Sequence, residues 1–352
     1  MTPPPFPGHP DPSNPGTEPL PRYGAQLAEA AATPAWQPDD TGPVPVLGRP
    51  APPPVPDARP TAAESEALEP AGVPTTERPI DPKPGRAGRN LKAAIGVGLG
   101  LGGVILASLL IWRPAFLLVL TAAVLVATVE LVRALRKGRF QPPLVPVLVG
   151  ALVMIGLAWS RGPTGLVAGF LITVLAVLLW RLADGPSGYL RDASAGVLVT
   201  LYVPLLAGFA ALLLAPDDGA LRVIAFIVTV VCSDVGGFAV GVLFGKHPMA
   251  PSISPKKSWE GMAGSVAACM LAGVLLIGLA LDGPWWGGLV FGAAIAVTAT
   301  IGDLGESLIK RDLGIKDMGD LLPGHGGLMD RLDSLLPSAA VAYLLLALLA
   351  PV

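Results

Sequence analysis

The sequence predicts an all-α, polytopic integral membrane protein with about nine transmembrane helices, and its composition and segment lengths support this fold class. Hydrophobic residues make up 52% of the 352 positions and charged residues only 14%, whereas soluble domains carry about a quarter charged residues. The mean hydropathy is +0.62. Apolar segments long enough to cross a bilayer follow one another from residue 93 onward. Such segments span as helices, because lipid offers backbone polar groups no partners.

The first 90 residues differ in composition from the rest of the chain. They hold 24 of the 39 prolines and few aromatic residues, so they cannot bury enough apolar surface to fold. The chain start also lacks the basic region and apolar core of a signal peptide. We expect residues 1–90 to be a disordered, Pro-rich cytoplasmic tail. Pro52-Pro53-Pro54 is a candidate polyproline binding segment, although a solvated tail is the preferred interpretation.

Nine apolar segments follow the tail, each of roughly 17 to 25 residues. They run near 93–111, 114–135, 144–160, 163–183, 193–215, 223–245, 262–281, 285–311 and 335–352. Five fall in the N-terminal transmembrane region, 91–220, and four in region 221–352, which also holds the polar motifs described below. Cys232 and Cys269 lie in apolar segments, so we expect small buried residues and no disulfide.

The distribution of Lys and Arg predicts the orientation, because these residues accumulate in cytoplasmic loops. With a cytoplasmic N-terminus and nine spans, the cytoplasmic side receives eighteen Lys and Arg residues. The outer side receives only Arg113, Arg161 and Arg222. The polar motifs are then all expected on the cytoplasmic side.

Twelve ionisable residues lie between Asp303 and Asp333, with apolar sequence on both sides. Asp303, Glu306, Ser307 and Lys310 fall at i, i+3, i+4 and i+7, so they share one helix face, which Arg311 extends. A snorkelling helix end would explain the basic residues but not the carboxylates. Asp330 and Asp333 form a second acidic pair. Facing carboxylates repel unless a cation lies between them, and hard oxygen ligands suit Mg²⁺. The predicted metal ligands are Asp303, Glu306, Asp330 and Asp333.

Two segments are candidate anion sites, one rich in glycine and one that contains two lysines. Gly324, Gly326 and Gly327 flank His325 and let backbone N–H groups approach an anion. His325 is either a phosphate donor or a structural hydrogen bonder. In 254–261, Ser254 is expected to be an N-cap before a helix that starts at Pro255, beside Lys256 and Lys257. An ordinary basic inner loop is the alternative.

Asp234 lies in the sixth apolar segment, where an ionised carboxylate costs at least about 2.5 kcal/mol if it faces lipid. Gly237, Gly241 and Gly245 continue its side of the helix and would let another helix approach closely. We expect Asp234 to line an interhelical cavity that opens to the cytoplasm, as a proton relay or a structural hydrogen bonder. Glu130 in the second segment poses the same question with less support.

Several other site types are absent from the sequence. The segment from Gly241 to Lys246 is one residue short of a phosphate-binding P-loop, and His247 replaces its Ser or Thr. There is no Cys-rich metal site and no Gly-x-Ser-x-Gly turn. Nothing indicates nucleic-acid binding.

The order of these residues resembles the motif of the phosphatidate cytidylyltransferases, also called CDP-diacylglycerol synthases. The similarity lies in Ser307-x-x-Lys310-Arg311, Lys316-Asp317 and Pro323-Gly324-His325-Gly326-Gly327-x-x-Asp330-Arg331-x-Asp333. Ser233-Asp234, Gly245-Lys246-His247 and residues 253–261 resemble a second block of that family. The resemblance covers about 225–340 strongly. Val242 and Ser252 stand where basic residues are expected, and the Pro-rich tail lies outside the pattern.

The resemblance implies transfer of CMP from CTP to phosphatidic acid, giving CDP-diacylglycerol and pyrophosphate for phospholipid biosynthesis. It implies a multi-pass protein of the plasma membrane, with the site on the cytoplasmic side and Mg²⁺ as cofactor on Asp303 and Asp330. A second cation, with potassium as a candidate, and a homodimer are left open. The expected catalytic residues are Lys310, Arg311, His325 and Asp330. The expected substrate-binding residues are Asp234, Ser254, Lys256, Lys257, Ser307, Lys316, Gly326, Gly327 and Arg331; of these, Lys256 and Lys257 would hold the triphosphate.

Two other functions share some of these sequence features. A cation- or proton-coupled transporter would place carboxylates in repeated halves with polar groups on the outer side, and the sequence shows neither feature. A cytidylyltransferase that acts on a different lipid phosphate fits the same motifs, because these residues bind the phosphate and not the acyl chains.

Overall fold

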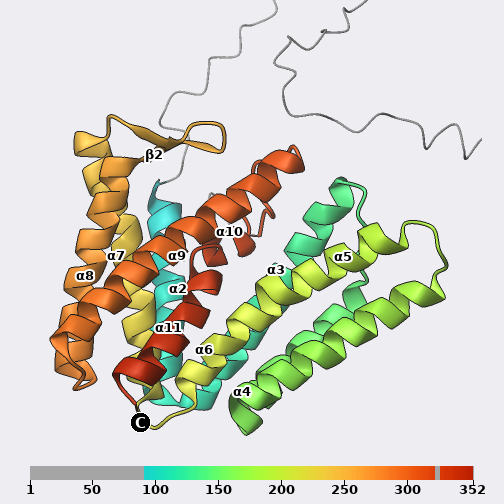
Figure 1. Ribbon diagram of the computed structural model, residues 1–352, viewed down its shortest axis with the longest axis horizontal. Coiled ribbons are helices and arrows are strands. Elements are labelled where there is room, and N and C mark those ends of the chain that lie inside the picture. The colour runs from blue at the N-terminus through green and yellow to red at the C-terminus, as the bar shows by residue number, and fades with distance from the viewer. Residues whose placement is uncertain (1–90, 322–325, 352) are drawn as a thin grey trace, which may run out of the picture. The chain divides into compact units, whose positions relative to one another are not determined.

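A computed structural model describes residues 91–321 and 326–351. The described helices belong to one unit, Pro79–Val352, and Figure 1 shows them as a helical bundle with one short β-hairpin at an end. The predicted tail, residues 1–90, lies outside the described residues. The helical class predicted from the sequence is confirmed.

The chain enters the bundle through two helices, α2 (Leu91–Ile111) and α3 (Arg113–Lys137). They are separated by Trp112 alone, whose backbone is extended, with φ −160° and ψ 108°. Pro114 follows in the first turn of α3, where its missing N–H needs no partner. The predicted boundary between segments 93–111 and 114–135 is therefore confirmed.

Helix α4 (Leu144–Ala183) is 40 residues long, but it turns back on itself at Gly162, where φ is 66° and ψ is −151°. Glycine adopts this left-handed conformation without a Cβ clash, and Pro163 then starts the second half. The halves lie side by side and antiparallel, because Gly150 contacts Thr173 and Gly169 contacts Met154. The predicted boundary between segments 144–160 and 163–183 is confirmed.

A continuous helical segment comes next, with a π-helical turn in its middle. It consists of α5 (Tyr189–Thr200), η1 (Leu201–Leu205) and α6 (Leu206–Leu214). Pro204 lies inside the π-turn, as expected where a missing backbone N–H interrupts the α-helical hydrogen-bond pattern.

Helices α7 (Gly219–Phe244), α8 (Trp259–Ala280) and α9 (Trp285–Asp312) pack closely and hold most of the candidate site. A Cβ atom on Gly241 would lie 3.6 Å from the Cα of Gly261, so the α7 and α8 backbones nearly touch. The predicted small-residue face of α7 is confirmed. At about 1.5 Å per residue, α9 is roughly 40 Å long, and Figure 1 shows it crossing the bundle diagonally.

Between α7 and α8 the chain forms an antiparallel hairpin of β1 (Pro248–Ala250) and β2 (Ser254–Ser258). The prediction of a helix start at Ser254 and Pro255 is wrong. Helix α8 begins after Ser258, whose side chain accepts a hydrogen bond from the Gly261 N–H at 3.1 Å. A Ser-Pro pair fits an extended edge strand as well as a helix start, and Ser258 supplies the cap four residues later.

The chain ends in a one-turn helix, α10 (Met329–Leu332), and then α11 (Leu335–Leu349), which packs against α9 and α6. Two apolar clusters stabilise the bundle, one built around α3, α4 and α6 and the other around α7, α9 and α11. Both cysteines are free, and the Cys269 thiol donates to the Thr229 carbonyl at 3.2 Å. Cys269 is buried, as expected, whereas Cys232 is only half-buried.

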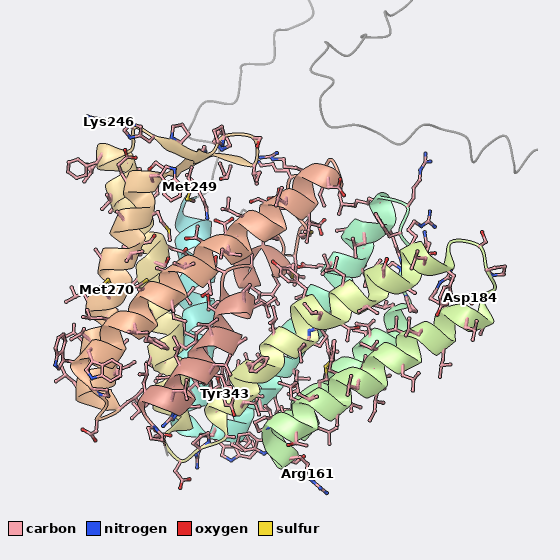
Figure 2. The ribbon with its side chains drawn as sticks, in the orientation of Figure 1. Arg161, Asp184, Lys246, Met249, Met270 and Tyr343 are labelled. Carbon is pink, nitrogen blue, oxygen red and sulfur yellow. The ribbon has the colours of Figure 1, made fainter. Side chains whose placement is uncertain are left out.

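Among the described residues, seven helices are long and apolar enough to cross a membrane, with α4 counted once. In α2, the described apolar part, Gly100–Ile111, is shorter than a span. A multi-pass architecture is supported, and the total of nine stays a prediction. Arg161 and Lys246, which the charge distribution assigns to the outer and inner sides, lie at opposite ends of the bundle (Figure 2).

Candidate active site

A cavity of about 270 Å³ lies between α7, α8, α9 and the hairpin. Asp234 lines it from α7, Lys256 and Lys257 from β2, and Asp303 from α9. Met249, labelled beside Lys246 in Figure 2, lines it from β1. Asp234 thus lines an interhelical cavity, as the sequence predicted. The cavity combines two ammonium groups with two carboxylates, a composition suited to a phosphate and a cation together.

An ion pair crosses this cavity from the hairpin to α9. The Lys257 Nζ lies 2.6 Å from Asp303 Oδ2, and both side chains are partly exposed. The other oxygen of Asp303 accepts a hydrogen bond from the Ser307 hydroxyl, one turn along α9, at 3.4 Å. Asp303, the first residue of the predicted polar face, therefore faces the hairpin that carries the two lysines.

A second cluster lies further along α9, centred on Lys310. Its ammonium group contacts the Glu306 carboxylate one turn earlier on the same helix and the Asp330 carboxylate of α10 at 2.9 Å. Glu306 is fully buried and Asp330 is 6% exposed at the side chain. Because α9 carries both Asp303 and Lys310, it joins this cluster to the cavity.

Backbone N–H groups of two segments complete the surroundings of Asp330. Its Oδ2 accepts hydrogen bonds from the N–H groups of Gly327 at 2.8 Å and Met318 at 3.0 Å. Gly326 has φ of 76°, and a Cβ atom there would lie 3.0 Å from Asp330 Oδ2, so glycine is needed at this position. Gly327 thus holds the Asp330 carboxylate and Gly326 leaves room for it, roles that the sequence did not predict for these glycines.

The carboxylates of the site are close enough to repel one another. Asp303 interacts electrostatically with Asp234 and Asp333, and Glu306 interacts with Asp330 and Asp333. These oxygen donors fit Mg²⁺ in kind, and Glu306 Oε1 is buried with no hydrogen-bond partner among the described atoms. Lys257 and Lys310 lie between the carboxylates, and no three acidic, His or Cys side chains within the described ranges converge as metal ligands do. The metal ligands stay a prediction.

The hairpin is tied to both of its neighbouring helices. Glu260, in the first turn of α8, accepts hydrogen bonds from the backbone N–H groups of Lys246 and His247 at 3.1 and 3.2 Å. Its other oxygen lies 2.5 Å from the His247 ring. Arg311 of α9 donates to the Ile253 carbonyl at 3.3 Å. These contacts hold β2, and with it Lys256 and Lys257, over the cavity.

The structure brings together most of the predicted site residues but not all. Those in or beside the two clusters are Asp234, Lys256, Lys257, Asp303, Glu306, Ser307, Lys310, Gly326, Gly327, Asp330 and Asp333. Arg331 is close enough to Asp234 for their charges to interact.

Three predicted residues lie elsewhere. Ser254 pairs with Ala250 in the hairpin and does not line the cavity. Lys316 lines a separate cavity on α3, and Arg311 binds the hairpin backbone. His325 lies outside the described residues.

Some contributing residues were not identified as site residues from the sequence. Tyr202, in the π-turn, donates to the Gly302 carbonyl at 3.4 Å and lies within electrostatic range of Asp303, Glu306 and Asp333. A proline at 204 was the only sequence signal for this turn. Glu260 lies in the first turn of α8, but the sequence predicted a helix start at Pro255, so neither this position nor its partners on the preceding loop were predicted.

Together, the fold and the site define a polytopic membrane enzyme with a lysine- and carboxylate-lined cavity at one end of its bundle. Residues 92–349 match the sequence model of the Cytidylyltransferase family. The phosphatidate cytidylyltransferase of Mycobacterium leprae (strain TN) is 51% identical over 283 residues, which are 75% of this chain and 90% of the relative.

Two further relatives carry the same name. The phosphatidate cytidylyltransferase of Mycobacterium bovis (strain ATCC BAA-935 / AF2122/97) is 46% identical over 277 residues, covering 75% of this chain and 90% of the relative. That of Brucella suis biovar 1 (strain 1330) is 37% identical over 209 residues, covering 58% and 72%. The chain belongs to the cytidylyltransferase family.

Proposed function

We propose that this protein transfers CMP from CTP to phosphatidic acid, giving CDP-diacylglycerol and pyrophosphate for phospholipid biosynthesis. Its family and the names of its relatives support both substrates. The arrangement along α9 supports the reaction type, because this helix carries Asp303 at the lysine-lined cavity and Lys310 at the Asp330 cluster. The two regions, one for the phosphates of CTP and one for the lipid phosphate, are then about two helical turns apart along α9.

The reaction needs alignment of the two substrates more than it needs a strong base. The second pKa of a phosphate monoester lies near 6, by analogy with phosphorylated side chains, so the attacking lipid phosphate is mostly anionic near neutral pH. One of its oxygens forms a bond to the α-phosphorus of CTP while the bond from that phosphorus to the oxygen bridging to the β-phosphate breaks. Pyrophosphate leaves with the bonding electrons, and no proton has to move in this step.

Lys256 and Lys257 bind the triphosphate, because they line the cavity and their hairpin is held by Glu260 and Arg311. Lys310 orients the lipid phosphate or stabilises the charge that develops in the transition state, together with His325. Arg311, whose Nε donates to the Ile253 carbonyl, contributes to the same reaction by holding the hairpin. Since Lys310 already contacts Glu306 and Asp330, those carboxylates fix where its ammonium group lies. Asp234 lines the lysine-containing cavity together with Asp303, and Ser307 donates a hydrogen bond to the Asp303 carboxylate.

Mg²⁺ is assigned to Asp303 and Asp330, with Glu306 and Asp333 as further oxygen donors and a second cation, potassium among the candidates, nearby. When bound, the divalent ion neutralises phosphate charge and aligns the phosphates for in-line displacement. The site holds more carboxylates than the two lysine side chains, Lys257 and Lys310, that contact them. This excess of negative charge favours binding of a metal cation, because Glu306 and Asp333 otherwise repel each other.

The proposed topology has nine spans and a cytoplasmic N-terminus in the plasma membrane, with the site on the cytoplasmic side. The positive-inside distribution of eighteen Lys and Arg residues against three supports it, as do the opposite positions of Arg161 and Lys246. A site at this boundary lets a lipid present its headgroup from the membrane while CTP arrives from the cytosol.

The test uses the purified full-length protein with phosphatidic acid, Mg²⁺ and each of the four nucleoside triphosphates in turn, and it measures pyrophosphate release. Release with CTP alone, and only when the lipid is present, is the expected result. Release with another nucleotide, or with CTP in the absence of lipid, would contradict the proposal.

A further inference from the structure

Glu130 is a buried carboxylate of α3, far in sequence from every motif of the proposed site. It is 6% exposed and lies between apolar neighbours on a helix that runs through the main apolar cluster. A buried ionisable group in a membrane-spanning helix is costly. Its position therefore requires a partner that the rest of α3 does not supply.

The partner is the backbone at the start of α10, the short helix that carries Asp330. The Met329 N–H donates to Glu130 Oε2 at 2.8 Å, across 199 positions of sequence. Leu328, the residue before α10, offers no side-chain hydrogen bond to the helix. Glu130 thus accepts a helix-end N–H that would otherwise be buried without a partner.

Two glycines make room for the same carboxylate. A Cβ atom on Gly327 would lie 2.6 Å from Glu130 Oε2, and one on Gly319 would collide with the Glu130 carboxyl group. The same backbone also contacts Asp330, because Gly327 and Met318, the residue before Gly319, donate their N–H groups to Asp330 Oδ2. Glu130 and Asp330 therefore hold the same backbone between them.

We infer that Glu130 is a positioning residue for Asp330, acting through the backbone at Gly319, Gly327 and Met329. Asp330 in turn contacts Lys310 at 2.9 Å, so the placement of α10 decides where that ammonium group lies. The inference rests on the proposed function, since it assigns the Glu130 contact to the same reaction. It also gives a reason for an acidic residue at position 130, which lies outside the strongly similar segment 225–340.

The test compares three substitutions at Glu130 in the purified full-length protein. Glu130→Gln keeps an oxygen that can accept the Met329 N–H, so kcat stays within about threefold of the parent. Glu130→Asp keeps the charge but is one methylene too short, and Glu130→Ala removes the acceptor. Both should lower kcat by about 10- to 100-fold, as for other residues that orient a site. The KM for CTP should change much less, because Glu130 does not line the lysine cavity.

Thr128→Ala is the matched control, because Thr128 is buried on the same helix and its hydroxyl has no partner among the described residues. It should keep the parent kcat. Gly319→Ala supplies a second test. The atoms nearest to the new methyl group all belong to Glu130, so this substitution should lower kcat in the parent but have little further effect in the Glu130→Ala background.

A Glu130→Ala enzyme with unchanged kcat would overturn the inference, since the acceptor would then not matter. An active Glu130→Asp with an inactive Glu130→Gln would also overturn it, since the negative charge would then matter and the reach of the acceptor would not. If Glu130→Ala fails to give a monodisperse protein in detergent, the comparison of Gln with Asp decides. An inactive parent protein would instead count against the proposed function, so the two failures are distinguishable.

Discussion

Replacing Lys310 by methionine should destabilise the protein strongly, because it leaves two buried carboxylates without their shared cation. The Lys310 side chain is 16% exposed, that of Asp330 is 6% exposed, and that of Glu306 is fully buried. Removing one partner of a buried ion pair costs about 3–5 kcal/mol. For a protein of this size, that corresponds to a fall in the unfolding midpoint on the order of 10 °C.

The structure also predicts which carboxylate causes the loss. Asp330 keeps hydrogen bonds from Gly327 and Met318 when the ammonium group is absent. Glu306 keeps none that the described structure shows, and its Oε1 is already unpartnered there. Glu306→Gln combined with Lys310→Met should therefore recover most of the lost stability, whereas Asp330→Asn combined with Lys310→Met should recover less.

The assay is thermal unfolding of the purified variants in one detergent, followed by loss of the monodisperse peak in size-exclusion chromatography. Lys316→Met is the matched control, because this exposed lysine lies in the segment after α9 and outside the Lys310 cluster. If Lys310→Met unfolds within about 2 °C of the control, or if the two double variants recover equally, the reasoning is refuted.

Three other predictions concern the metal, the helix packing and the tail. Asp303→Asn and Asp330→Asn should each abolish turnover while the protein still inserts into membranes; near-normal pyrophosphate release by both would contradict the metal assignment. Gly292→Ala should lower the unfolding midpoint, because its Cβ atom would collide with the Cys269 carbonyl, whereas Gly278→Ala, with open space around it, should leave the midpoint unchanged or raise it slightly. Equal midpoints would mean that α8 and α9 are less closely packed than described. Deleting residues 1–85 should leave specific activity largely intact, and complete loss in a well-inserted protein would show that the tail is more than a linker.

Composition and helical spacing predicted much of the fold and part of the site. The turn at Gly162 could be located because glycine, proline and a change of apolar segment coincide there. The prediction that Asp303 and Ser307 share one face of a helix was also correct, because the spacing of residues within one helix follows from its pitch. These are local properties, and the sequence determines them locally.

Contacts between elements could not be obtained in this way. Lys257 pairs with Asp303, and Glu130 with Met329, only because the bundle brings distant segments together. The helix start at Ser254 was wrong because strand pairing with residues 248–250 competes with local capping. Lys316 was grouped with the other basic residues by its place in the motif, whereas the chain after α9 directs it to a different cavity.

The most direct test of the proposed function identifies the product. The purified protein is incubated with CTP, Mg²⁺ and an equimolar mixture of phosphatidic acid, lysophosphatidic acid and a polyprenyl phosphate, and the lipids are analysed by mass spectrometry. The expected result is CDP-diacylglycerol as the main nucleotide-bearing lipid, and its absence when Asp303→Asn protein is used. A cytidylyl group found mainly on another lipid phosphate, or on no lipid at all, would contradict the assignment.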